Sequence, residues 1–301
     1  MLRKAEAKRL NKQYHKGKTV IITGANSGIG YEVARWMATG GARVIMACRN
    51  KKKAAVAAEK IHRIKADADL HIMHLDLASL ESVKNFSQEF RKEYPRLDVL
   101  VNNAGVMATP YRKTSDGFEW QFGINHLGHF ALTGHLLDLL IKTGGSRVVT
   151  VTSIAHFKGQ LHFDDLSGES WYGRMKAYRQ SKFANLLFAY ELQKRLKRAG
   201  SDTISVAAHP GLSSTNIVWL PFPLTLLKEL VLMSAAKGAL PVLMAAAGES
   251  IRGGEYIGPA GIKQSYGYPV VLRSSADSYK EDLGLKLWEV SEQMTGIVYP
   301  D

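Results

Sequence analysis

The stretch Thr23-Gly-Ala-Asn-Ser-Gly-Ile-Gly30 lies between an apolar run and an amphipathic segment. A buried strand that enters a glycine-rich turn and then a helix is typical of a dinucleotide-binding unit. Gly24 allows a sharp turn, Gly28 lets a pyrophosphate approach the backbone, and Gly30 lets the helix pack closely on the strand. A tight turn without a ligand is the alternative. The candidate cofactor-binding residues here are Gly24, Asn26, Ser27, Gly28, Ile29 and Gly30.

Apolar strands alternate with helical stretches along most of the chain. Continuous apolar strands separated by helices predict a parallel sheet that is covered on both faces. The crossovers in such sheets are right-handed, so the expected fold class is α/β, a doubly wound parallel sheet of the Rossmann type. The expected strands span residues 20–22, 44–46, 70–75, 97–101, 148–151 and 204–208, and the expected helices span residues 29–38, 54–65, 80–90, 118–140 and 175–198.

The 301 residues carry a formal net charge of +13. Much of this charge lies in a basic N-terminal extension, residues 1–17, and in residues 49–53. Basic residues interleaved with aromatic ones, or a recognisable binding module, would indicate nucleic acid, and the sequence has neither. We therefore expect no nucleic-acid partner, whereas contact of the extension with an acidic membrane surface stays open. Residues 18–301 are expected to form one domain.

The cysteine content and the hydropathy indicate the cellular compartment in which the protein is expected. The single cysteine, Cys48, excludes an intramolecular disulfide and is typical of a reducing compartment. The basic N-terminus has no apolar stretch behind it, as a secretory signal would, and no uncharged apolar run is long enough to span a bilayer. We expect a cytoplasmic protein, with peripheral contact to a membrane as the open alternative.

An apolar segment at residues 217–227 is interrupted by Pro221 and Pro223. Two prolines in the middle exclude one continuous core helix. The segment is either a helix–loop–helix packed on the core or an apolar C-terminal lid over a substrate cleft. In the second case Trp219 and Phe222 would close over the substrate.

The end of the second expected strand bears on the choice of dinucleotide. An acidic residue usually binds the free ribose 2′-hydroxyl of NAD at this place. This chain has Cys48 and Arg49 instead. Because a guanidinium can bind a 2′-phosphate with two parallel hydrogen bonds, Arg49 predicts NADP(H) in preference to NAD(H), with a solvated arginine as the alternative.

Two further strand ends carry candidate cofactor contacts. Asp76 and Leu77 follow the third expected strand, where a short acid can face the adenine amino group or simply precede the next helix. Asn102-Asn-Ala-Gly105 follows the fourth expected strand, and its small residues suit close backbone approach to a cofactor, with a plain turn as the alternative. The candidate residues of this second motif are Asn103, Ala104 and Gly105.

Tyr178 and Lys182 are four residues apart in an expected helix, so they lie on one face about 6 Å apart along its axis. A free tyrosine has a pKa of about 10, and a neighbouring ammonium favours the phenolate. Lowering the pKa of Tyr178 by about three units corresponds to roughly 4 kcal/mol and would suit general acid–base work at neutral pH. Ser153, at the end of the fifth expected strand, can hydrogen-bond a substrate oxygen and hold it against Tyr178. A surface helix pair is the alternative.

With these motifs in this order, the chain resembles a short-chain dehydrogenase/reductase from about residue 18 to about residue 299. The resemblance implies that Asn125 interrupts its helix to hold a water in a proton relay from Lys182. It implies catalytic roles for Asn125, Ser153, Tyr178 and Lys182. It also implies that Tyr178 and Lys182 contact the nicotinamide nucleoside, with Lys182 on the ribose, and that the amide of the nicotinamide lies beside Pro210, Gly211 and Thr215.

Three stretches, residues 125–130, 45–49 and 287–292, are similar to the retinol-dehydrogenase-like branch, which includes the oxidoreductase part of WW-domain-containing oxidoreductases. Many members of that branch carry an N-terminal membrane anchor, which we do not expect here. Residues 45–49 and 75–79 also look like light-dependent protochlorophyllide reductase.

The expected function is an NADP(H)-dependent oxidoreductase that interconverts a carbonyl and an alcohol on an apolar substrate, which is retinoid-, steroid- or lipid-like. The alternatives are an NADP(H)-binding regulatory protein with little turnover and a protochlorophyllide-reductase-like enzyme. No metal site is expected. A homodimer or tetramer would use the helices around residues 118–140 and 175–198, although apolar faces there suit a monomer as well.

Overall fold

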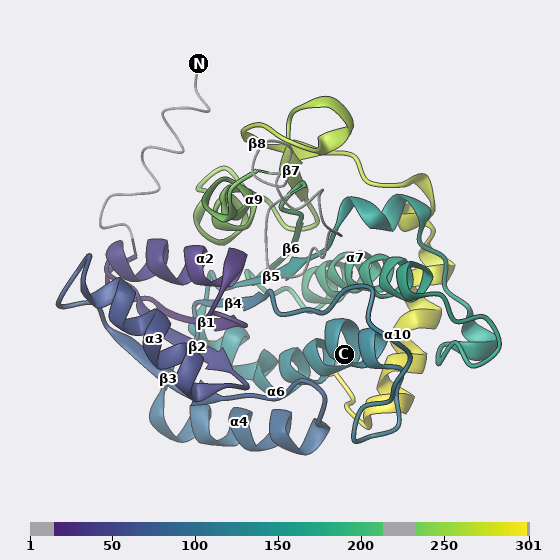
Figure 1. Ribbon diagram of the computed structural model, residues 1–301, viewed down its shortest axis with the longest axis horizontal. Helices are drawn as coiled ribbons and strands as arrows, with labels where there is room; N and C mark the ends of the chain where they lie inside the picture. The colour runs from purple at the N-terminus through teal and green to yellow at the C-terminus, as the bar shows by residue number, and fades with distance from the viewer. Residues whose placement is uncertain (1–14, 213–232, 300–301) are drawn as a thin grey trace, which may run out of the picture.

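Eight strands form one sheet in the order β3-β2-β1-β4-β5-β6-β7-β8 (Figure 1). The computed structural model describes residues 15–212 and 233–299. Strands from β3 to β7 pair in parallel, whereas β8 is antiparallel to β7, so the expected doubly wound α/β class is confirmed with one antiparallel edge strand. The strands are β1 (Thr19–Thr23), β2 (Arg43–Cys48), β3 (Leu70–His74), β4 (Val99–Asn102), β5 (Arg147–Val151), β6 (Ile204–Ala208), β7 (Tyr256–Pro259) and β8 (Pro269–Leu272).

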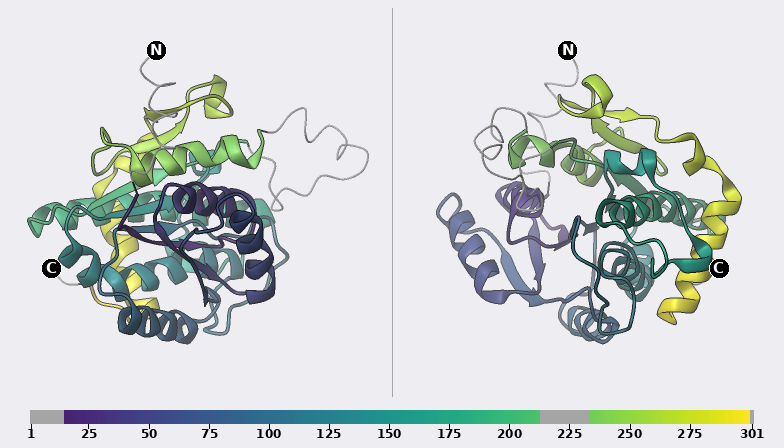
Figure 2. Two further views of the ribbon diagram at one scale, coloured as in Figure 1. Left: turned by 90° about the vertical axis from the view of Figure 1, so that its left-hand side faces the viewer. Right: turned by 45° about the vertical axis from the view of Figure 1, so that its right-hand side comes forward.

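Helices cover both faces of the sheet. Val20 and Ile22 of β1 pack into a core with α2, α3 and α9, whereas Ile21 packs into a second core with α4, α6 and α7. In the left view of Figure 2, α9 (green) and α4 (blue) lie on opposite sides of the sheet. The helices are α2 (Gly28–Thr39), α3 (Lys51–His62), α4 (Leu80–Glu93), α5 (Trp120–Phe122), α6 (Gly128–Thr143), α7 (Arg174–Arg198), α9 (Ala235–Ala247) and α10 (Glu281–Thr295).

The long helix expected at residues 118–140 is broken in the structure. A π-helical turn, η1 (Gly123–Leu127), separates the short α5 from α6, and the Gly128 N–H bonds to the carbonyl of Gly123, five residues back. Such bulges occur frequently at functional sites. The expected start of the helix at residue 54 is also late, because the Asn50 side chain accepts a hydrogen bond from the Lys53 N–H and so caps α3 earlier.

The expectation that residues 204–208 close the sheet is wrong, since β7 and β8 extend it. Each of these strands has only four residues. Neither is a continuous apolar run of the kind by which a strand is recognised in sequence, because β7 contains Gly258 and Pro259 and β8 begins with Pro269. The α10 helix packs against α6 and α7, where Trp288 contacts the rings of Phe130 and Phe188. It therefore covers part of the helices that an oligomer was expected to use.

Three expectations fall wholly or partly outside the described residues: most of the basic extension, the Trp219/Phe222 lid and Thr215. Within residues 15–212 and 233–299, no helix combines the length and apolar character that crossing a bilayer requires.

Candidate active site

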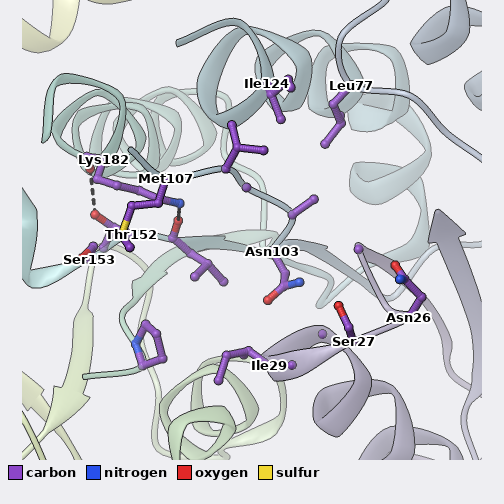
Figure 3. A pocket seen from close by; sticks show the side chains of 18 of the residues that line it. Asn26, Ser27, Ile29, Leu77, Asn103, Met107, Ile124, Thr152, Ser153 and Lys182 are labelled. Atoms are coloured by element: carbon purple, nitrogen blue, oxygen red, sulfur yellow. Dashed lines mark hydrogen bonds between the residues drawn. The ribbon is translucent and has the colours of Figure 1, made fainter. Parts of the chain in front are cut away.

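A cavity of about 490 Å³ opens at the carboxyl ends of β1, β4, β5 and β6 (Figure 3). This edge of a parallel sheet is where ligands bind in open α/β folds. The structure brings nearly every expected site residue to this one cavity. Those that line it are Gly24, Asn26, Ser27, Gly28, Ile29, Gly30, Arg49, Asp76, Leu77, Asn103, Ala104, Gly105, Ser153, Tyr178, Lys182, Pro210 and Gly211.

The glycine turn is shaped so that larger residues do not fit. Gly24 and Gly28 have φ of 67° and 55°, a region that L side chains rarely adopt. A Cβ on Gly30 would lie 2.4 Å from the Gly24 carbonyl oxygen and 2.5 Å from Asn103 Nδ2. Ser27 is the N-cap residue of α2, its side chain makes no hydrogen bond to the helix, and it lines the cavity. The first N–H groups of a helix can bind a phosphate, so pyrophosphate binding at this turn stays a prediction.

The Asn103 loop is bonded to the glycine turn. Thr23 Oγ1 accepts hydrogen bonds from the backbone N–H groups of Asn103 and Ala104, both at 2.9 Å. Asn103 Nδ2 donates to the Thr23 carbonyl at 2.8 Å. A Cβ on Gly105 would lie 3.1 Å from Asn125 Oδ1 and 3.4 Å from Lys182 Nζ. The small residues of this motif therefore let its backbone pass between the glycine turn and the catalytic candidates.

Asn125 lies in the π-helical turn η1, which is the interruption that the family resemblance implied. Its Oδ1 accepts from the Val106 N–H at 2.8 Å, and its Nδ2 donates to the Val106 carbonyl and to Ser181 Oγ, both at 2.9 Å. The residue is fully buried and does not line the cavity. Its observed contacts hold the loop after Gly105 and the helix that carries Lys182, and its part in a proton relay stays a proposal.

Ser153, Tyr178 and Lys182, which the sequence predicted to act together, line the same cavity. Lys182 Nζ lies 5.9 Å from the centre of the Tyr178 ring and donates a hydrogen bond to the Val151 carbonyl at 3.0 Å. Ser153 lies two residues after β5 and caps the 3-10 turn η2 (Ile154–Lys158), where its Oγ accepts from the Ala155 N–H. Helix α7 therefore presents the phenol and the ammonium to the same space.

The expected acidity of Tyr178 is wrong for the protein alone. Burial raises the pKa of Tyr178, and a hydrogen bond with the Ser153 side chain lowers it by a smaller amount. Burial also lowers the pKa of Lys182 to about 8. Because the ammonium is itself desolvated and bonded to a carbonyl, it does not offset the desolvation of the phenol.

Arg49 and Asp76, which the sequence predicted to contact the adenosine part of a dinucleotide, also line the cavity. Arg49 is exposed, and its part in binding a 2′-phosphate stays a prediction. Asp76 Oδ1 accepts from the Ala78 N–H at 3.0 Å, which supports the alternative interpretation of an acid at a helix start, although the residue also lines the cavity. Burial raises the pKa of the neighbouring Cys48 thiol to about 11, so this cysteine is a packing residue.

Sequence reasoning missed eight residues that line the cavity. Val106 and Met107 continue the Asn103 motif, and Leu212 follows Pro210 and Gly211, so adjacency to a motif was an available signal for these three. Leu75, Ile124 and Thr152 likewise adjoin predicted site residues, whereas Ala47 and Val151 lie on strands and gave no separate signal. The missed residues are Ala47, Leu75, Val106, Met107, Ile124, Val151, Thr152 and Leu212.

Three buried histidines make stability sensitive to acid. Burial lowers the pKa of His126 and His209 to about 3 and that of His129 to about 4, from the usual 6.5. Below pH of about 6.5 the unfolded chain binds protons that the folded chain does not, so the free energy of unfolding falls as the pH falls toward 4. Each histidine is expected to contribute on the order of 1 kcal/mol per pH unit to this fall in the free energy of unfolding.

Urea unfolding between pH 7 and pH 4.5 measures how the free energy of unfolding depends on pH. His126→Gln, which removes one titrating group, is expected to flatten the profile, and an unchanged slope would contradict it.

The structure is a Rossmann-type α/β fold in which the glycine turn, Ser153, Tyr178 and Lys182 line one cavity. Comparison with known proteins agrees. The model of the short chain dehydrogenase family matches residues 18–220. Human retinol dehydrogenase 14 is 40% identical over 94% of this chain and 87% of its own. Bos taurus retinol dehydrogenase 12 is 41% identical over 93% of this chain and 87% of its own.

Solved structures extend the likeness to three dimensions. An uncharacterised protein from Mycobacterium paratuberculosis is 40% identical and superposes with a TM-score of 0.82 over 98% of both chains. A short-chain dehydrogenase from Shigella flexneri, solved with NADP, shares the fold at 24% identity, with a TM-score of 0.65 over 81% of this chain and 98% of that one. The chain belongs to the short-chain dehydrogenase family, in its retinol-dehydrogenase-like branch.

Proposed function

We propose that this protein is an NADP(H)-dependent oxidoreductase that interconverts a carbonyl and an alcohol on an apolar substrate. The observation that carries the proposal is the convergence of Ser153, Tyr178 and Lys182 on the cavity that also contains the glycine turn. The names of the 40% identical relatives, retinol dehydrogenases, support an alcohol and carbonyl pair as the substrate class.

Each of these side chains has its own role in the proposed carbonyl reduction. Tyr178 donates a proton to the carbonyl oxygen, and burial keeps the phenol protonated for that step by raising its pKa. Ser153 holds the same oxygen by a hydrogen bond. Lys182 binds the nicotinamide ribose and, with Asn125, supplies the path by which the proton is replaced. The nicotinamide, when bound, supplies the hydride.

Apolar side chains, among them Met107, Ile124 and Leu212, line much of the cavity. Leu212 is exposed, with 42% of its surface accessible. Apolar walls around a few polar groups are typical of sites for hydrophobic small molecules. This lining supports a retinoid-, steroid- or lipid-like substrate.

Steady-state oxidation of NADPH with a panel of retinal, steroid ketones, aliphatic aldehydes and quinones tests the proposal. Turnover of at least one carbonyl is the expected result. The rival is an NADP(H)-binding regulatory protein, which would bind NADPH and reduce none of them. The polar set at Ser153, Tyr178 and Lys182 favours the enzyme, because a sensor has no need of a buried proton donor.

The preference for NADP(H) depends on Arg49. Replacing Cys48 with Asp and Arg49 with Ala removes the cation that would bind the 2′-phosphate and places an acid where NAD has a ribose hydroxyl. The ratio of kcat/KM for NADPH to that for NADH is expected to fall by roughly 10- to 100-fold, since a charge-assisted hydrogen bond contributes about 1.5–3 kcal/mol. Lys52→Ala, which removes an exposed charge that does not line the cavity, is the control. An unchanged ratio in the double variant would refute the assignment.

The basic extension is proposed to bind acidic membrane surfaces in a protein that is otherwise cytoplasmic. A vesicle-binding assay over a range of salt concentrations, with the full chain and the chain lacking residues 1–17, tests this contact. Equal binding by both would exclude the extension as the contact.

A further inference from the structure

Thr23 Oγ1 is the centre of a buried hydrogen-bond network that the proposed chemistry does not itself use. It accepts from the N–H groups of Asn103 and Ala104, and His129 Nε2 lies 2.9 Å away. The other ring nitrogen, His129 Nδ1, lies 3.0 Å from the backbone carbonyl oxygen of Asn125. His129 is 1% exposed, so water does not complete these bonds.

Counting donors and acceptors fixes the direction of every bond. A threonine hydroxyl has two lone pairs and one hydrogen, and the two N–H groups occupy the lone pairs. A carbonyl only accepts, so His129 Nδ1 donates to the Asn125 carbonyl, and Nε2 of the neutral ring accepts from the Thr23 hydroxyl at 2.9 Å. The Val101 carbonyl, 3.3 Å from the same hydroxyl, is the longer contact.

We infer that His129 is a positioning residue that holds the dinucleotide-binding loops and the Asn125 turn in one geometry. The inference rests on the proposed function, because it assigns His129 a part in that same site. His129 does not line the cavity. Its ring nitrogens are bonded to the Thr23 hydroxyl and to the Asn125 carbonyl, so it acts on the site through these two residues.

The Nε2 bond acts on the dinucleotide side. Moving the Thr23 hydroxyl would move the backbone of Asn103 and Ala104, which it holds. That loop already touches the glycine turn, since a Cβ on Gly24 would lie 3.1 Å from the Ala104 Cβ. A small shift is therefore passed directly to the residues that surround the pyrophosphate.

The Nδ1 bond acts on the catalytic side. It fixes the carbonyl of Asn125, whose side chain is bonded to Val106 and to Ser181. Ser181 directly precedes Lys182 on α7. Its hydroxyl accepts from Asn125 Nδ2 and donates to the Tyr178 carbonyl, both at 2.9 Å. The π-helical turn and the helix of the proton donor are thus held together.

Two conservative substitutions separate the two bonds. Asn places a donor at the position of Nδ1, and Gln places an acceptor at the position of Nε2. His129→Asn is expected to keep kcat at saturating NADPH within about threefold and to weaken the Kd for NADPH by roughly 10- to 100-fold. His129→Gln is expected to keep the Kd within about threefold and to lower kcat by roughly 10- to 100-fold. The Kd is measured by titration without substrate.

His126→Gln is the matched control. His126 is equally buried and on the adjoining turn, but its Nε2 is bonded to Ser291 of α10, outside the cavity. His126→Gln is expected to lower thermal stability and to leave both kcat and the Kd for NADPH unchanged.

If all three variants lower only the melting temperature, or if both His129 variants change kcat and Kd alike, the inference is overturned. If the wild-type protein binds NADPH but reduces no carbonyl, the proposed function fails. The inference is then tested by the Kd alone, and it is overturned if His129→Asn binds NADPH as tightly as the wild type does.

Discussion

Tyr178→Phe is expected to bind NADPH with wild-type affinity and to lose roughly 10²- to 10⁴-fold in turnover, the usual contribution of a positioned acid. The substitution removes the proton that the carbonyl oxygen needs and keeps the ring that fills the buried site. The raised pKa of Tyr178 strengthens this expectation for reduction, because it keeps the phenol protonated at neutral pH. Single-turnover oxidation of NADPH with an excess of carbonyl substrate measures the loss.

Tyr190→Phe is the control for that experiment. Tyr190 lies on the same helix, three turns farther on, and its hydroxyl is bonded to Ser274, away from the cavity. It is expected to change stability and to leave turnover as it is. Turnover by Tyr178→Phe at the rate of the Tyr190 variant would refute the assigned chemistry.

Gly30→Ala is expected to abolish measurable binding of NADPH and to destabilise the fold by about 1–3 kcal/mol, the usual cost of overpacking. The added Cβ would meet the Gly24 carbonyl at 2.4 Å, and this is a backbone atom of the glycine turn that cannot move without distorting the phosphate site. Titration with NADPH and thermal unfolding measure the two effects.

Gly284→Ala is the matched control, since the same Cβ there would meet nothing nearer than Glu191 Oε2 at 3.5 Å, an ordinary contact. In helix α10 this exchange is expected to raise stability slightly, because alanine is the better helix former. Wild-type affinity for NADPH in Gly30→Ala would show that the glycine turn does not hold the dinucleotide.

The fold was predictable where burial imposes a pattern. The central strands are buried on both faces, so β1, β4 and β6 appear in the sequence as apolar runs close to their observed bounds. Local hydrogen bonding was harder to anticipate. Nothing in the sequence distinguishes the π-helical turn at Asn125 from a regular helix without the family resemblance, and β7 and β8 are too short and too rich in glycine and proline to stand out.

The candidate site was predictable as a set of motifs, because strand order brings their ends to one edge of the sheet. Its electrostatics were not, since the pKa of Tyr178 depends on how completely the phenol and Lys182 lose water. His129 was missed for a related reason. A buried histidine in a helix is usually a packing residue, and only the positions of Thr23 and the Asn125 carbonyl show its two bonds.

A crystal structure of the NADPH complex tests the central claim most directly, that one cavity brings the nicotinamide to Tyr178. We expect the nicotinamide ring to lie against the Tyr178 hydroxyl and the ribose to contact Lys182 Nζ. We expect the pyrophosphate to lie at the N-terminus of α2 and the 2′-phosphate to contact Arg49. A nicotinamide that lies away from Tyr178, or a dinucleotide bound elsewhere on the protein, would contradict it.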